Sequence, residues 1–143
     1  MLIAVTGFGD TAVLLPVAAT IFVWLLLTGA SRAAAWWAAS IFLCGGLTAV
    51  LKIYFWGCPP APDLHSPSGH TSFATLVYGA IALIVAAEGG RWRPPVATAC
   101  AGGLIAGIAG SRLLLDAHSI PEIVLGGTIG GGFLALFGQG YWR

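Results

Sequence analysis

Charge is scarce in this sequence. Only 8% of the 143 residues are Asp, Glu, Lys or Arg, whereas an ordinary soluble domain carries about a quarter. Apolar residues make up 58% of the chain, and the mean hydropathy is +0.93. This composition excludes an ordinary soluble fold. The formal net charge is only +1 and no run of Lys or Arg is present, so we expect no nucleic-acid partner.

Cysteine is also rare. Cys44, Cys58 and Cys100 form no CxxC pair, and two of them fall inside apolar stretches, so neither a disulfide framework nor a zinc site is expected. The first ten residues contain no Lys or Arg, and no convincing signal-cleavage site follows them. We therefore interpret the first apolar stretch as a retained membrane span.

Long apolar runs dominate the rest of the chain. A helix needs about 20 apolar residues to cross a hydrocarbon core of roughly 30 Å, and it satisfies its own backbone there. Five stretches reach or approach this length, at about 11–29, 33–51, 70–87, 95–115 and 121–138. The sequence therefore predicts an all-α, polytopic transmembrane helix bundle that forms a single domain over residues 1–143.

The arginines between these stretches predict an orientation. Five spans place four basic residues on the same membrane face: Arg32, Arg91, Arg93 and Arg143. The opposite face holds the N-terminus, the 52–69 loop and the 112–120 link. The positive-inside rule makes the arginine-rich face cytoplasmic. We expect an integral protein of a bacterial inner membrane, with its N-terminus outside and its C-terminus inside.

Glycine is abundant in the last apolar stretch, at Gly126, Gly127, Gly130, Gly131 and Gly132. The run resembles a nucleotide-binding loop, but it lies in an uncharged helix with no strand before it. Small residues four apart allow membrane helices to approach closely, and we prefer this interpretation. The same helices would suit a homodimer, although the sequence leaves the oligomeric state open.

The two polar links on the outer face hold most of the reactive side chains: Lys52, Asp63, His65, Ser68, His70, Arg112, Asp116, His118 and Glu122. Ionisable groups near membrane depth usually mark a functional path, although loops are polar in any protein. We attribute Asp63 and Asp116 to ordinary loop polarity and give His65 at most an auxiliary role.

Several of these residues suit phosphate binding. Ser68, Gly69 and His70 open the third stretch, where the free N–H groups of a helix N-terminus favour an anion. Lys52 closes the second stretch and Arg112 closes the fourth, which adds two cations at the same end of the bundle. Lys52 could instead serve as a plain anchor that extends to the membrane interface.

The histidines suit phosphoryl transfer. Of His70 and His118, one can attack phosphorus while the other protonates the leaving oxygen. Glu122 follows His118 by four residues, so on a continuous helix it would share the imidazole's face and orient it. Ser119 and Glu122 also match a capping box, so Glu122 could cap a helix instead of, or as well as, orienting His118.

These residues stand in the order of a known signature. The sequence resembles the type 2 phosphatidic acid phosphatases (PAP2), whose signature is Lys-x6-Arg-Pro, then Pro-Ser-Gly-His, then Ser-Arg-x5-His-x3-Asp. The second part is intact at residues 67–70. The third part, residues 111–122, keeps the spacing and ends in Glu122 instead of Asp. The first part keeps Lys52 but has Pro59 where the family has arginine.

The resemblance implies a role for each matching residue. His118 would be the nucleophile that forms a phosphohistidine, His70 the general acid, and Glu122 the residue that orients the nucleophile. The phosphate would be bound, without a metal or other cofactor, by Lys52, Ser68, Gly69 and Arg112. Usual membrane members have six spans, so five spans imply a PAP2-like core that lacks one helix.

The implied function is metal-independent hydrolysis of a lipid phosphate monoester or pyrophosphate at the outer face. Phosphatidic acid, phosphatidylglycerophosphate and undecaprenyl pyrophosphate are the substrates that the resemblance suggests, and the sequence does not choose among them. His65 could replace the missing arginine. The alternative is a non-catalytic PAP2-like protein that binds or moves phospholipid. The absent arginine favours this alternative, and the retention of both histidines disfavours it.

Overall fold

The computed structural model describes residues 2–58, 60–88 and 92–142. Within these ranges the chain forms no strand, and its helices are α1 (Leu2–Gly7), α2 (Thr11–Leu27), α3 (Ser31–Gly57), α4 (Gly69–Ala87), α5 (Arg93–Leu114) and α6 (Ile120–Trp142). Five segments are long and apolar enough to cross a membrane, and the first of them, Ala4–Leu27, begins within α1 and includes α2. The prediction of an all-α transmembrane bundle with five spans is confirmed.

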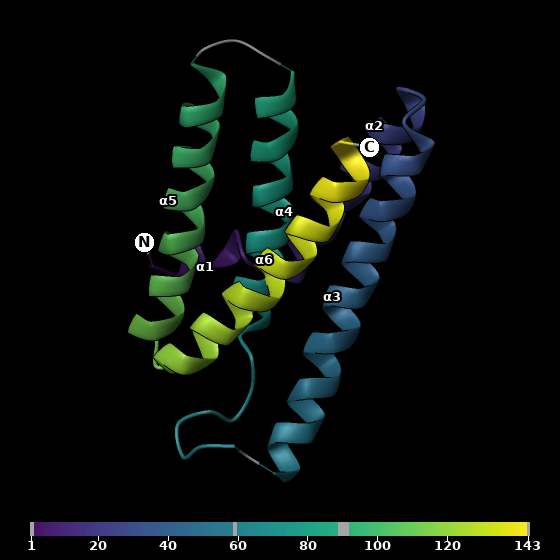
Figure 1. The fold of residues 1–143 in the computed structure, drawn as a ribbon. Helices are drawn as coiled ribbons and strands as arrows, with labels where there is room; N and C mark the ends of the chain where they lie inside the picture. Colours follow the sequence, from purple (N-terminus) through teal and green to yellow (C-terminus); the bar gives the residue numbers. More distant parts are fainter. Residues whose placement is uncertain (1, 59, 89–91, 143) are drawn as a thin grey trace.

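Helix α4 lies at the centre of the bundle. It packs against α5 on one side and α6 on the other, while α6 crosses the bundle obliquely and also reaches α3 (Figure 1). The C-terminal ends of α3 and α5, the N-terminal ends of α4 and α6, and the 58–68 loop lie together at the lower end of the view. We call this the histidine end, because it carries His70 and His118.

Aromatic packing joins three helices near the other end. Trp37 of α3 and Phe137 of α6 are fully buried and meet edge to face, with their ring centroids 5.1 Å apart. Trp37 Nε1 also donates a hydrogen bond to the carbonyl oxygen of Ala18 in α2, at 2.9 Å. Large rings with a satisfied polar atom stabilise such a junction.

Glycines allow α4 and α6 to approach closely. A Cβ atom added to Gly126 would lie 2.5 Å from the carbonyl oxygen of Ser68, and one added to Gly130 would overlap the carbonyl oxygen of Ser72. The close-packing interpretation therefore holds for these two positions. It does not extend to Gly131 and Gly132, where an added Cβ would meet nothing within 4 Å.

Two features depart from the expected boundaries. Helix α3 continues to Gly57, so Lys52 lies inside the helix and does not close it. Aromatic residues follow Lys52, and such residues are common where membrane helices meet the interface. The short helix α1 was also not predicted, and a turn at residues 8–10 separates it from α2.

The residues on which the orientation rests are only partly described. Arg32 and Arg93 lie at the starts of α3 and α5, at the end of the bundle opposite the histidines. Arg91 and Arg143 fall outside the described residues. The orientation in the membrane therefore remains a prediction.

Candidate active site

The residues with expected roles in phosphate chemistry gather at the histidine end. All but Lys52, which lies inside α3, are at a helix end or in an adjoining turn: Ser68, Gly69 and His70 at the start of α4, Arg112 in the last turn of α5, His118 just before α6, and Glu122 in its first turn. Because the four helix ends meet there (Figure 1), residues that are distant in the sequence become neighbours.

A tight turn keeps His118 close to Arg112. The backbone N–H groups of Ala117 and His118 donate to the carbonyl oxygen of Arg112, at 3.0 and 3.3 Å. Asp116 adopts the left-handed conformation with φ of 51°, which Asp tolerates better than most residues. The chain therefore reverses directly after α5, and His118 remains beside the end of that helix.

The imidazole of His118 is paired with the carboxylate of Glu122. Nδ1 lies 2.7 Å from Oε2, and the two side chains are only 11% and 8% exposed. An ionised carboxylate can only accept a hydrogen bond, so in this pair the proton lies on Nδ1 of His118. Nε2 then keeps its lone pair, which is the form of histidine that can attack phosphorus.

Glu122 also joins the 58–68 loop to α6. Its Oε1 accepts hydrogen bonds from the backbone N–H groups of His65 and Ser66, each at 2.8 Å. Oε2 accepts the N–H of Ser119 at 3.2 Å, and Ser119 Oγ accepts the N–H of Glu122 at 3.4 Å, which together form a capping box. Glu122 therefore caps α6 and pairs with His118 at the same time, so the two roles are not alternatives.

Arg112 has an unused donor at this end. Its Nε is buried and has no hydrogen-bond partner among the residues that the structure describes. A buried N–H without an acceptor is costly, and a charged one more so. An oxygen atom of a bound phosphate would supply the missing acceptor through a charge-assisted hydrogen bond.

Lys52 lies against the first residue of α4. A Cβ added to Gly69 would be 3.6 Å from Lys52 Nζ, so the absence of a side chain at position 69 leaves room between the ammonium group and the helix N-terminus. The two residues, together with His70, border the same hollow of about 270 Å³. This places a cation and the free N–H groups of α4 on one small cavity, a combination that favours an anion.

Ser68 caps α4 from a buried position. Its Oγ accepts hydrogen bonds from Thr71 Oγ1 at 3.0 Å and from the backbone N–H of Thr71 at 3.5 Å. The side chain is fully buried, so its first function in the fold is to fix the N-terminus of α4. Its hydroxyl proton remains available as a donor.

Two further hollows adjoin the first. One of about 290 Å³ is lined by Lys52, Trp56, His65 and Ser66. Another, of about 430 Å³, is bordered by His65 and Ser66 and reaches His118 and Glu122. Because neighbouring hollows share Lys52 or residues 65–66, we treat the three as one polar basin, the histidine basin.

Comparison with known proteins agrees with this geometry. The sequence model of the PAP2 superfamily matches residues 59–143, which is more than half of the chain. The chain belongs to the PAP2 superfamily. The matched region contains His70, Arg112, His118 and Glu122, while Lys52 lies before it.

A curated relative matches most of the chain. A Klebsiella pneumoniae protein described as "Uncharacterized 22.5 kDa protein in cps region" is 32% identical over 140 residues. The alignment covers 93% of this chain and 66% of that protein, so the chain spans about two thirds of its relative's length. No solved structure matches the chain.

The site of this PAP2 protein includes residues that the sequence did not indicate. The turn between α1 and α2 lies on His70, since a Cβ added to Gly9 would be 3.3 Å from His70 Cδ2. His70 is also within electrostatic reach of Asp10, Lys52 and Arg112. A sequence signal existed, because Asp10 is the first charged residue of the chain and stands alone before an uncharged stretch.

The position of the missing PAP2 arginine, Pro59, falls outside the described residues. His65, the expected auxiliary residue, has an exposed side chain that borders two hollows of the histidine basin. Its backbone N–H, not its ring, makes the contact with Glu122. Within residues 2–58, 60–88 and 92–142, no three His, Cys, Asp or Glu side chains are grouped to hold a metal ion.

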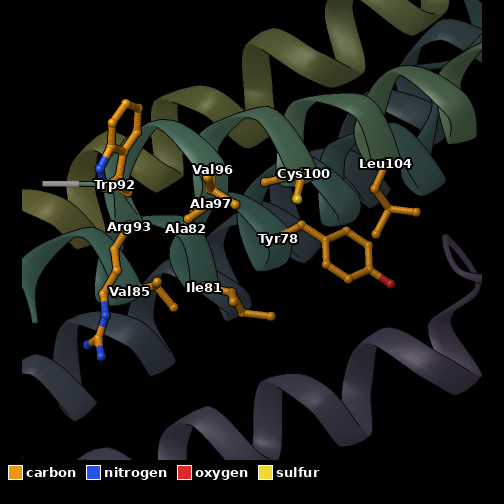
Figure 2. A pocket seen from close by; sticks show the side chains of 11 residues that line it. Tyr78, Ile81, Ala82, Val85, Trp92, Arg93, Val96, Ala97, Cys100 and Leu104 are labelled. Atoms are coloured by element: carbon orange, nitrogen blue, oxygen red, sulfur yellow. The ribbon is translucent and has the colours of Figure 1, made fainter. Parts of the chain in front are cut away.

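A larger cavity lies away from the histidines. It is an apolar groove of about 560 Å³ between α4 and α5, with Trp92 and Arg93 at one end and Tyr78 and Leu104 at the other (Figure 2). Its span along α5, from residue 93 to residue 104, corresponds to about 16 Å of helix. Apart from the Cys100 thiol, the Tyr78 hydroxyl and Arg93, the side chains along its walls are apolar, and no histidine or carboxylate is among them. The lining therefore suits an apolar chain and not the reaction itself.

Proposed function

We propose that this PAP2 protein hydrolyses a membrane-lipid phosphate monoester or pyrophosphate without a metal, through a phosphohistidine at His118. The observation that carries the proposal is the His118–Glu122 pair in the turn that follows Arg112, whose Nε is buried and unpartnered among the described residues. This arrangement combines a nucleophile held in its reactive tautomer with an unused donor for a phosphate oxygen. Membership of the PAP2 superfamily supports the same class of chemistry.

The first half of the reaction forms the intermediate. Nε2 of His118 attacks phosphorus, and the bond between phosphorus and the lipid oxygen breaks. His70, as the imidazolium, gives its proton to that oxygen, so the lipid leaves as a neutral alcohol when the substrate is a monoester. Glu122 stabilises the positive charge that the His118 ring gains when Nε2 bonds to phosphorus.

The second half releases phosphate. A water molecule attacks the phosphohistidine and gives a proton to His70, which is neutral after the first step. The bond between phosphorus and Nε2 breaks, inorganic phosphate leaves, and both histidines return to their starting states. Lys52, Arg112 and the N-terminus of α4 stabilise the negative charge on the phosphoryl oxygens in both steps.

The tail of the lipid has a suitable place in the groove between α4 and α5. At one end of this groove, Tyr78 OH donates a hydrogen bond to the carbonyl oxygen of Phe8, at 2.7 Å. Phe8 precedes Gly9, which lies on His70. The Tyr78 end of the groove and the His70 ring therefore both contact the same short turn, which supports a substrate with a phosphate head and an apolar tail.

The same geometry disfavours the alternative of a protein that only binds or moves phospholipid. Anion binding needs the cations and the α4 N-terminus, but it does not need a carboxylate that fixes one tautomer of a histidine. Phosphatidic acid, phosphatidylglycerophosphate and undecaprenyl pyrophosphate remain the substrate candidates, with the active site on the extracytoplasmic face.

Release of inorganic phosphate tests the proposal. The purified full chain in detergent is incubated with each of the three lipids in the presence of EDTA. We expect release from at least one lipid, undiminished by EDTA. Saturable lipid binding without any phosphate release would instead support the non-catalytic alternative, and activity that EDTA abolishes would contradict a metal-independent mechanism.

A further inference from the structure

The N-terminal turn of residues 8–10 is anchored to the two helices that carry the site. Tyr78 OH of α4 donates to the carbonyl oxygen of Phe8 at 2.7 Å. Thr6 Oγ1 donates to Ser111 Oγ of α5, also at 2.7 Å. Ser111 directly precedes Arg112, so the turn is fixed relative to the phosphate-binding end of α5 as well as to α4.

Glycine at position 9 allows the turn to contact the His70 ring. Gly9 is buried, and an added Cβ would lie 2.7 Å from Ile108 Cγ2 and 3.3 Å from His70 Cδ2. A side chain at position 9 would crowd Ile108 and His70. Glycine therefore lets the backbone of the turn lie against the His70 ring. Asp10 follows Gly9 directly and is among the charged groups that act electrostatically on the His70 ring.

Asp10 differs in charge from the other groups that act on His70. Three of the four are basic side chains, namely Arg112, His118 and Lys52, and Asp10 is the acidic one. Burial of the ring most strongly disfavours a protonated His70, and the two cations that attract a phosphate act in the same direction, yet a general acid must carry a proton. A nearby carboxylate opposes that effect.

The structural role of Asp10 leaves its charge available. Its Oδ1 accepts the backbone N–H of Ala12 at 3.1 Å, which caps the N-terminus of α2. A carboxylate has two oxygens with about four lone pairs, so one capping bond does not exhaust it. Asn and Ser cap a helix about as well as Asp does. Replacing Asp10 by either residue therefore removes the charge and keeps the cap.

We infer that Asp10 is a positioning residue for the reaction, because its carboxylate, carried by the N-terminal turn, favours the protonated form of His70, which donates to the leaving oxygen. The inference rests on the proposed phosphatase function. It assigns a role to the segment before the first long helix, where sequence patterns predicted only the N-terminal flank of a span.

The test compares two phosphate esters with different leaving groups. An alkyl or lipid alkoxide needs a proton as it leaves, whereas p-nitrophenolate does not. For Asp10→Asn we expect kcat on the lipid phosphate to fall by about tenfold or more, part of the contribution that general acid catalysis makes, and kcat on p-nitrophenyl phosphate to change less than twofold. The alkaline limb of the lipid-phosphate pH profile should move to lower pH, because the charge that favours protonated His70 is gone.

Asp10→Ser, which also keeps a capping side chain, should behave like Asp10→Asn, and Asp10→Glu should recover part of the lipid activity. Glu88→Gln removes the same charge at the other end of α4 and should leave both substrates unaffected. Equal losses on both substrates in the Asn and Ser variants, together with a lower melting temperature, would show a purely structural role and overturn the inference.

The outcomes separate the inference from the function on which it rests. If the wild-type chain releases phosphate from neither ester, the proposed phosphatase function is wrong. If the wild type is active and Asp10→Asn keeps the wild-type ratio of the two rates and the wild-type pH profile, the phosphatase function stands and the role of Asp10 is wrong.

Discussion

The backbone N–H of Ser68 donates a hydrogen bond to the carbonyl oxygen of Glu122, at 3.0 Å. This bond joins the residue that caps α4 to the residue that pairs with His118. Gly126, one turn further along α6, lets the two helices remain in contact, because any side chain there would strike the carbonyl oxygen of Ser68. The N-terminal end of α4 and His118, the proposed nucleophile, are therefore held in one unit, as the proposed phosphate site requires.

Glu122 should affect rate and stability through different contacts. Glu122→Gln keeps the size of the side chain but loses the charge, so it no longer stabilises the His118 ring when Nε2 bonds to phosphorus. We expect kcat to fall by about 10- to 100-fold, as happens when the partner that orients a functional histidine is changed. The melting temperature should also fall, because four hydrogen bonds converge on this carboxylate.

The matched control for Glu122 is Ser119→Ala, which removes the Oγ of the capping box and leaves the His118–Glu122 pair in place. It should cost about 1 kcal/mol of stability and change kcat little. Normal turnover in Glu122→Gln, with only a loss of thermal stability, would show that Glu122 is a cap and nothing more.

Arg112 should contribute mainly to phosphate binding. Arg112→Ala removes a charge-assisted contact of about 1.5 to 3 kcal/mol, so we expect kcat/KM to fall by about one to two orders of magnitude. Arg112→Lys should recover only part of this loss, because an ammonium group cannot reproduce the planar fork. Arg32→Ala, at the opposite end of the bundle, is the control and should have wild-type kinetics.

The kinetics of these arginine variants are measured together with inhibition by inorganic phosphate. Weaker inhibition in Arg112→Ala would accompany the expected loss of kcat/KM. An Arg112→Ala protein that binds phosphate as tightly as the wild type would contradict the placement of the phosphoryl group beside this guanidinium.

The groove between α4 and α5 should determine activity on long-chain lipids. Ala101 lines this groove, so Ala101→Trp fills part of it. We expect a several-fold increase of KM for a long-chain lipid phosphate and little change for a water-soluble phosphate ester. Ala99→Trp places the same ring at an exposed position of α5 outside the groove and should change neither. Equal behaviour of the two variants on the long-chain lipid would exclude the groove as the tail site.

A native thiol can report the orientation of the bundle. Cys58 is exposed at the end of α3, at the histidine end, while Cys44 is buried. In a Cys100→Ala protein in intact cells, we expect a membrane-impermeant maleimide to label Cys58. A protein that carries Cys58→Ser, Cys100→Ala and Trp92→Cys should remain unlabelled until the cells are opened, and the reverse pattern would place the active site in the cytoplasm.

Sequence alone was sufficient for much of this account. The apolar runs predicted the long helices within a few residues, apart from the extension of α3, because membrane spans are set by length and composition. The spacing of His118 and Glu122 predicted their pairing on one continuous helix. The pair forms, but His118 lies before α6, so its imidazole reaches Glu122 from the preceding turn. These inferences depend on local regularities.

The remaining features depend on tertiary packing. Asp10 reaches the surroundings of His70 only because Tyr78 and Ser111, far along the chain, hold the N-terminal turn in place. The groove is formed by side chains of both α4 and α5, and no pattern in either helix alone indicates it. The sequence also left open whether Glu122 caps α6, orients His118 or does both. Both roles need the same residue type at the same position.

The central claim is that phosphate passes through a covalent bond to His118, and trapping that bond tests it most directly. The wild-type chain is mixed with ³²P-labelled phosphatidic acid, or with another of the three lipids that it hydrolyses, and quenched in alkali within the first turnover. We predict label on the peptide that contains His118, stable to alkali and lost in acid, and no label in His118→Asn. An active wild-type protein without trapped label, or a His118→Asn protein that turns over at the wild-type rate, would contradict the account.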